Sequence, residues 1–136
     1  NVPYGITTDS NNDVFVASYF GPCQKFTSEG NFIIDFLYPD PPDGQIYFYD
    51  IARDIYDNVY VIVKGSQESD ESYSVAKDED GNPVHIMKFN NNGDFVANIQ
   101  LSKINRNALR LEVDDYGKIY VLFNDKDKIG IEVLGQ

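Results

Sequence analysis

Three stretches of the chain share one pattern, and this pattern decides the fold. They read DSNNDVFV at residues 9–16, DIYDNVYV at residues 54–61 and DDYGKIYV at residues 114–121. Each begins with an aspartate, runs through four residues typical of turns, and ends on a β-branched residue, an aromatic residue and a valine. The aspartates are separated by 45 residues (9 to 54) and by 60 residues (54 to 114). Three matches at the same internal spacing indicate an internal repeat.

A second pattern follows in the first two repeats. KFTSEGNF at residues 25–32 matches KFNNNGDF at residues 88–95. In both stretches a short polar run with a glycine separates two phenylalanines, and glycine reaches positive φ angles at little cost. Both stretches therefore predict a tight β-hairpin.

Each repeat is expected to form four short strands joined by hairpins. In the first repeat we place them at residues 5–9, 14–18, 23–26 and 32–36. In the second repeat they lie near residues 51–54, 59–64, 84–89 and 95–101. In the third repeat they begin at residue 109 and continue near 119–123 and 129–133, with the fourth strand missing. Such a sheet has two apolar faces, which are buried when sheets stack around an axis as the blades of a propeller.

Composition and charge agree with an all-β protein and argue against several functions. Tyrosine and phenylalanine supply all of the 14% aromatic content, and hydrophobic residues make up 42% of the 136 positions, a balance that favours strands. The net charge of −11 repels nucleic acid, and we expect an extracellular or cell-surface protein. With one cysteine and one histidine, the chain forms neither an internal disulfide nor a Cys/His zinc cluster. No apolar run approaches the roughly 20 residues of a membrane span.

The repeats resemble those of the NHL family of β-propellers. The family unit reads Pro-x-Gly-Ile-x-x-Asp, a short turn, a strand of the form β-aromatic-Val-Ala, and later a Phe-x-x-x-Gly hairpin. Residues 3–9 (PYGITTD) and 14–17 (VFVA) fit this unit. The second repeat departs from it at Asp50, where the first repeat has Gly5, and the third repeat departs from it most.

The resemblance implies one all-β domain over residues 1–136 that is a partial NHL-like propeller. Its four-stranded antiparallel blades would span residues 3–38, 49–101 and 108–136, the last blade being incomplete, and an acidic insertion at residues 65–83 interrupts the second. Propellers have four to eight blades, and those of this family have about six, so three blades leave two open edges. We therefore expect a fragment of a longer polypeptide. The alternative is that two copies associate to close one ring.

The candidate binding residues fall on one rim and on the strands that line the channel of such propellers. The set is Tyr4, Tyr47, Tyr49, Arg53, Arg106 and Arg110. Aromatic and arginine side chains are enriched at binding faces, and we place the rim residues on the loops that lead from one blade to the next. Packing between blades is the alternative role for them. Arg53 precedes the repeated aspartate, where it would bind an anion in the channel or pair with an acid of a neighbouring blade.

Two polar turns are calcium candidates because oxygen-bearing side chains alternate in them, as they do in calcium loops. One turn holds Asp9, Asn11 and Asp13, and the other, within the acidic insertion, holds Asp78, Asp80 and Asn82. At the first turn we predict a hairpin in which Asp9 bonds to turn amides, because Asp54 and Asp114 repeat without the same oxygen pattern. At the second turn a solvated acidic loop is the alternative to a weak calcium site.

No catalytic residue is expected in this chain. His85 is placed at the surface or at a sheet edge, and Cys23 is expected to be a small apolar filler. Among the positions that would line the channel, only Glu112 is able to ligate a metal. We therefore expect a non-catalytic binding or scaffold module that recognises a protein or a small-molecule ligand. The alternatives are a propeller-type hydrolase or lyase whose metal site lies in blades outside this chain, and a structural subunit that assembles through its open edges.

Overall fold

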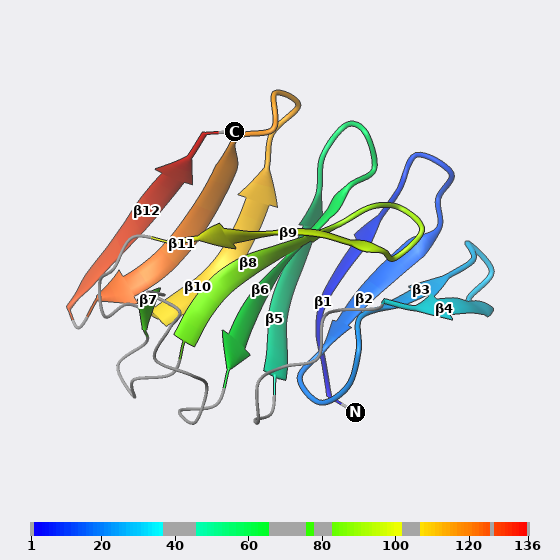
Figure 1. The fold of residues 1–136 in the computed structure, drawn as a ribbon, viewed down its shortest axis with the longest axis horizontal. Helices are drawn as coiled ribbons and strands as arrows, with labels where there is room; N and C mark the ends of the chain where they lie inside the picture. Colours follow the sequence, from blue (N-terminus) through cyan, green and yellow to red (C-terminus); the bar gives the residue numbers. More distant parts are fainter. Residues whose placement is uncertain are drawn as a thin grey trace.

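The fold was obtained as a computed structural model that describes residues 2–36, 46–65, 76–77, 83–101, 107–125 and 127–135. These residues form twelve strands arranged in three separate antiparallel sheets (Figure 1). The expectation of an all-β protein is therefore confirmed. None of the described segments contains a helix of the length and apolarity that crossing a membrane requires.

The three sheets follow one another along the chain. The first sheet holds β1 (Pro3–Thr8), β2 (Val14–Ser18), β3 (Gln24–Phe26) and β4 (Phe32–Asp35) in that order. The second sheet holds β5 (Ile46–Arg53), β6 (Val59–Gly65), β8 (Pro83–Phe89) and β9 (Phe95–Gln100), and the two-residue strand β7 (Ala76–Lys77) also pairs with β8. The third sheet holds β10 (Asn107–Val113), β11 (Ile119–Asp125) and β12 (Lys128–Leu134).

Most of these strands lie close to the segments expected from the repeats, and β2 has the bounds that were predicted. The exception is β5, which begins at Ile46 and not near residue 51. The two-residue strand β7 lies inside the acidic stretch at residues 65–83, which the sequence predicted to be an insertion that forms an extended hairpin or a loop. Most of that stretch lies outside the described residues.

Five hairpin loops share one backbone geometry. In each loop a side-chain oxygen of the first residue accepts hydrogen bonds from the amides two and four positions later, and the fourth residue has a positive φ angle. The first residues are Asp9, Thr27, Asp54, Asn90 and Asp114. The fourth residues are Asn12, Gly30, Asp57, Gly93 and Gly117, with φ between 62° and 86°. Asparagine, aspartate and glycine are the residues that adopt this conformation most readily, so the hairpin interpretation of both repeated patterns is confirmed.

Neighbouring sheets pack against each other by the same rule at both contacts. The side chains six and eight residues after the repeated aspartate enter the cluster shared with the next sheet, namely Phe15 and Ala17 of the first sheet and Tyr60 and Ile62 of the second. The receiving sheet contributes the residues three before, five after and seven after its own aspartate. These are Ile51, Val59 and Val61 in the second sheet and Leu111, Ile119 and Val121 in the third. Two apolar layers of the same construction therefore hold the three sheets together.

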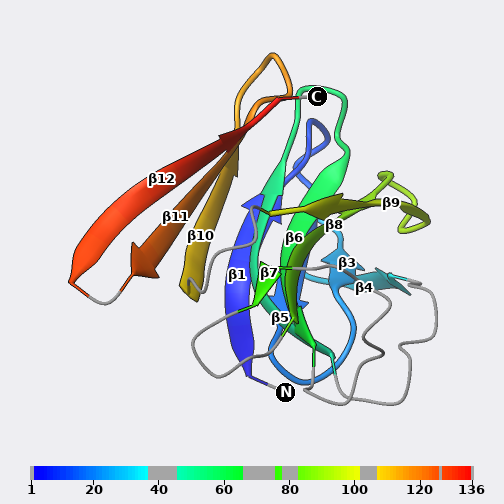
Figure 2. The same ribbon diagram turned by 60° about the vertical axis from the view of Figure 1, so that its left-hand side comes forward.

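The first strands of the three sheets, β1, β5 and β10, run side by side (Figure 2). A Cβ atom on Gly5 would come within 2.9 Å of Asp50 Oδ1 and 3.0 Å of the backbone nitrogen of Ile51, so β1 approaches β5 closely. Asp50 in turn accepts a hydrogen bond of 2.8 Å from the amide of Leu111 on β10. The aspartate that departs from the glycine pattern thus connects the second sheet to the third.

Candidate functional site

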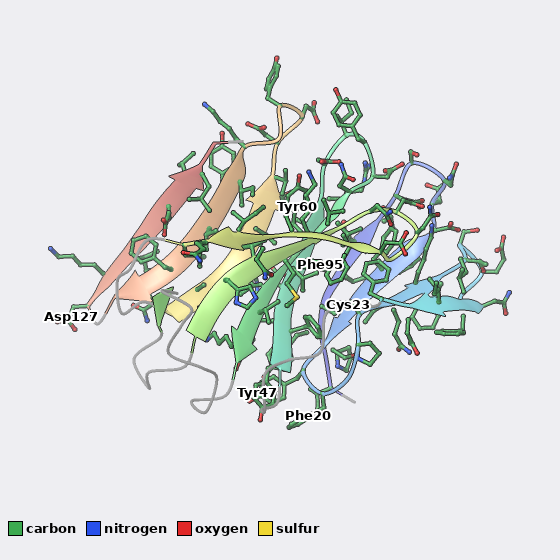
Figure 3. The ribbon with its side chains drawn as sticks, in the orientation of Figure 1. Phe20, Cys23, Tyr47, Tyr60, Phe95 and Asp127 are labelled. Atoms are coloured by element: carbon green, nitrogen blue, oxygen red, sulfur yellow. The ribbon has the colours of Figure 1, made fainter. Side chains whose placement is uncertain are left out.

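Five aromatic side chains gather at the end of the molecule where β1 and β5 begin. We call this group the aromatic rim, and its members are Tyr4, Tyr19, Phe20, Tyr47 and Tyr49. The rings of Tyr19 and Tyr47 are stacked with centroids 4.6 Å apart, and Phe20 meets Tyr19 edge to face at 4.6 Å. Tyr4 and Phe20 remain 46% and 47% exposed. Figure 3 shows Phe20 and Tyr47 together at this end.

The local backbone explains how the rim is assembled. The ladder between β1 and β2 shifts register between Pro3 and Gly5, and the ladder between β5 and β6 shifts between Phe48 and Asp50. Each shift leaves one tyrosine, Tyr4 or Tyr49, as the extra residue of a β-bulge, a feature that redirects a side chain. The ammonium of Lys64 lies 4.2 Å from the ring centroid of Tyr49, which is a cation–π contact.

The predicted rim residues are brought together in part. Tyr4 and Tyr49 are in ring contact, but Tyr47 and Tyr49 lie within β5, so their placement on a loop was wrong. Arg106 lies outside the described residues. Arg110 is an exposed residue of β10, so its placement on a loop was also wrong. Sequence reasoning missed Tyr19 and Phe20, whose signal was the Tyr-Phe-Gly-Pro run that follows β2.

Arg53 is held by an acid of its own sheet. Its guanidinium contacts the carboxylate of Asp57 at 3.1 Å and donates to the backbone carbonyl of Asp54 at 3.2 Å. Asp57 also accepts hydrogen bonds from the amide and the hydroxyl of Ser10 in the first sheet. The expected ion pair is present, but its acid belongs to the same sheet and not to a neighbouring one.

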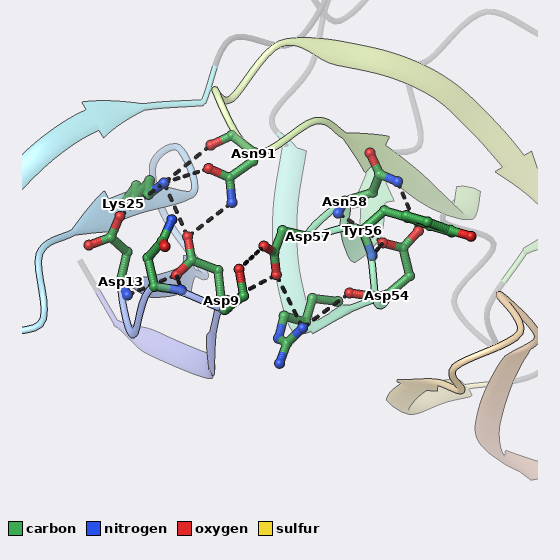
Figure 4. Close-up of polar contacts among 11 residues, drawn as sticks. Asp9, Asp13, Lys25, Asp54, Tyr56, Asp57, Asn58 and Asn91 are labelled. Atoms are coloured by element: carbon green, nitrogen blue, oxygen red, sulfur yellow. Dashed lines mark hydrogen bonds and ion pairs between the residues drawn. The ribbon is translucent and has the colours of Figure 1, made fainter.

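A buried ion-pair network joins the first hairpin to the second sheet (Figure 4). The ammonium of Lys25 lies 3.3 Å from Asp9 and 3.2 Å from Asp13, and it donates to the side chain of Asn91 at 2.7 Å. Asn91 also donates to Asp9 at 3.0 Å. Burial raises the pKa of Asp9, but the hydrogen bonds from Asn91, the turn amides and Lys25 outweigh it, so the net pKa is lowered. The cation between these two carboxylates is therefore a lysine of the chain itself.

The second carboxylate oxygen of the repeated aspartate has a different partner in the first sheet. In the second sheet it accepts a hydrogen bond of 2.9 Å from the phenolic hydroxyl of Tyr60, and in the third sheet it accepts one of 3.0 Å from the hydroxyl of Tyr120. The equivalent position in the first sheet is Phe15, which has no hydroxyl. Lys25 and Asn91 supply the missing donors to Asp9.

His85 lies within the second sheet and not at its edge, so its expected placement at an edge was wrong, while the residue as a whole is half-buried. It belongs to β8 and pairs with Val63 of β6 on one side and with Gln100 of β9 on the other. Its Nδ1 atom is buried, and among the described residues no group donates to it or accepts from it. Burial lowers the pKa of His85 from 6.5 to about 4.

The burial of His85 predicts a loss of stability in mild acid. Between pH 6.5 and about pH 4, His85 binds a proton in the unfolded chain but stays neutral in the folded chain. The contribution of neutral His85 to the free energy of unfolding is therefore complete above pH 6.5 and is lost as the pH falls to about 4. We expect the His85→Leu variant to lack roughly 3 kcal/mol of the fall in unfolding free energy between pH 7 and pH 4. Urea unfolding of both proteins at several pH values measures the difference, and parallel curves would contradict it.

Cys23 is fully buried in the cluster between the first two sheets, and burial raises the pKa of its thiol. Its expected role as an apolar filler is confirmed. Asp78, Asp80 and Asn82 lie outside the described residues. Within the described part of the chain, no three histidine, cysteine, aspartate or glutamate side chains gather as metal ligands do.

Neither a comparison with models of protein families nor a search of curated proteins gives a match to this chain.

Proposed function

We propose that this chain is a non-catalytic binding module made of three blades of a β-propeller, and that it recognises a partner protein through the aromatic rim. The propeller assignment is supported by the repeated packing of one sheet on the next. Both contacts use the same positions relative to the repeated aspartate, as expected when similar units stack around an axis.

The observation that carries the binding role is the aromatic rim itself. Five rings from β1, β5 and the segment that follows β2 form one connected set of ring contacts. Tyr4 and Phe20 nevertheless keep nearly half of their surface in solvent. Rigid aromatic side chains supply much of the energy of recognition at little cost in conformational entropy. In other proteins, aromatic side chains that line a groove bind extended proline-rich segments. The net charge of −11 favours a segment with basic flanks.

A peptide titration tests this proposal. The probe is a synthetic decaproline with two lysines at each end, and the readout is the NMR chemical shifts of the tyrosine and phenylalanine rings. We expect saturable shifts at Tyr4, Phe20 and Tyr47. The double variant Tyr4→Ser with Phe20→Ser is expected to bind at least tenfold more weakly, because an aromatic anchor contributes roughly 2 kcal/mol.

The matched control is the double variant Tyr56→Ser with Tyr116→Ser. These tyrosines are 82% and 93% exposed on hairpin loops at the opposite ends of β5 and β10, so their loss is expected to leave binding unchanged. Equal binding by the rim variant and the native chain would contradict the proposal. Saturable rim shifts with maltohexaose but not with the peptide would assign the rim to carbohydrate and overturn the protein partner.

A further inference from the structure

The outward face of the first sheet exposes apolar residues whose equivalents are buried in the other two sheets. Ile6, three residues before the repeated aspartate, is 70% exposed, whereas its equivalents Ile51 and Leu111 are 4% and 5% exposed. Val14 and Val16 stand five and seven residues after the aspartate and are half-buried. Their equivalents in the other two sheets are fully enclosed by a neighbouring sheet. The first sheet thus offers the residues that the second and third sheets use to receive a neighbour.

The outward face of the third sheet carries the complementary set. Leu122 stands eight residues after the aspartate and pairs with Ile131 of β12, just as Ile62 pairs with Ile86 in the second sheet. Ile131 is 65% exposed, whereas Ile86 is fully buried against the third sheet. Ile129 and Val133 lie on the same side of β12 as Ile131, because side chains alternate along a strand, and both are exposed. By register Ile129 and Ile131 correspond to Val84 and Ile86, which the second sheet buries against the third. Val133 corresponds to Lys88, which lies outside that cluster.

We propose that the outward face of the third sheet docks onto the outward face of the first sheet in a second copy of this chain, and that two copies close head to tail. The partner is identified by continuity with the two contacts already present. Ile6, Val14 and Val16 match the residues with which the other two sheets receive a neighbour. Ile129 and Ile131 match residues that the second sheet buries against the third. An apolar row of this kind on an open sheet is stabilised by burial. A contact between two different faces closes into a ring when its rotation permits.

This inference rests on the blade-like stacking in the proposed function and not on what the aromatic rim binds. If the native chain is a monomer that still binds the proline peptide, the docking proposal alone is contradicted. A dimer that ignores the peptide would remove the rim proposal alone.

Light scattering on a sizing column tests the docking with two single variants. Ile6→Glu places a charge on the receiving face, and Ile131→Glu places one on the donating face. Both side chains are largely in solvent within one chain, so each variant is expected to keep the circular dichroism of the native protein. We expect the native chain to have the mass of two copies and each variant the mass of one. Val96→Glu, an exposed position on β9 outside both faces, is the control that stays a dimer.

Mixing the two variants distinguishes this arrangement from a symmetric one. The Ile6→Glu chain keeps its donating face and the Ile131→Glu chain keeps its receiving face, so an equimolar mixture is expected to regain the mass of two copies. Two outcomes would overturn the proposal. One is a native chain that stays monomeric up to millimolar concentration, and the other is a mixture that stays monomeric when the native chain is a dimer.

Discussion

Asp9→Ala is expected to lower the free energy of unfolding by about 4 kcal/mol. The carboxylate accepts hydrogen bonds from the amides of Asn11 and Asp13 and from Asn91, and it pairs with the ammonium of Lys25. Lys25 is only 7% exposed. Removing Asp9 therefore leaves its buried positive charge with one carboxylate partner, Asp13, in place of two. Breaking a buried pair on one side costs about 3–5 kcal/mol, and the lost turn acceptor adds to this. Urea unfolding followed by circular dichroism measures the change.

The matched control for this loss is Asp114→Ala in the third sheet. Asp114 accepts the same two turn amides, but it is half-buried, and its further partner is the hydroxyl of Tyr120 and not a charged group. Both substitutions remove the acceptor of the turn amides, but only Asp9→Ala also removes a carboxylate that pairs with a buried ammonium. The destabilisation is therefore expected to be clearly larger at Asp9. Equal losses in the two variants would show that the turn, and not the ion pair, carries the effect.

Tyr60→Ala is expected to cost a similar amount, about 4 kcal/mol, because it empties the largest fully buried site among the described residues. The ring of Tyr60 lies in the cluster between the second and third sheets, and the ammonium of Lys88 lies 5.2 Å from its centroid. The cavity would therefore weaken the contact between these sheets as well as the second sheet itself. Differential scanning calorimetry measures the loss as a lower Tm and a smaller unfolding enthalpy.

Tyr60→Phe separates the ring from the hydroxyl. It removes the hydrogen bond of 2.9 Å to Asp54 and keeps the ring, so we expect a loss of about 1 kcal/mol. The first sheet already combines this aspartate with a phenylalanine at Phe15, but there Lys25 and Asn91 replace the hydroxyl as donors. If Tyr60→Phe were as damaging as Tyr60→Ala, the hydrogen bond and not the packing would dominate this site.

Local patterns were sufficient to predict the hairpins and most of the strands. The aspartate, the positive-φ residue and the strand that follows lie within eight residues of one another. Interactions between neighbours in the sequence therefore determine their geometry. The predicted strand at residues 14–18 accordingly matches β2. The acceptor role of Asp9 towards the turn amides was predicted for the same reason.

Contacts between distant segments were beyond the reach of these patterns. The sequence showed only that Asp50 replaces the glycine of the repeat. Its contact with Leu111 was not predicted, because the two residues are 61 positions apart. Lys25 and Asn91 meet across 66 residues, and nothing near Lys25 in the sequence indicates that it is buried. Tyr19 and Phe20 follow a strand end, so their place in the aromatic rim depends on how β5 packs beside β1. His85 was misplaced because a lone histidine gives no sign of whether its strand is central.

The hairpin loops leave part of their own sequence free to diversify. Tyr56 and Tyr116 serve the loop through backbone amides that donate to Asp54 and Asp114, while their rings project into solvent. Folding therefore places almost no demand on the identity of these two side chains. The side chains at these loop positions can therefore change one at a time without disturbing the sheets. The same positions are natural sites for grafting new recognition chemistry onto this scaffold.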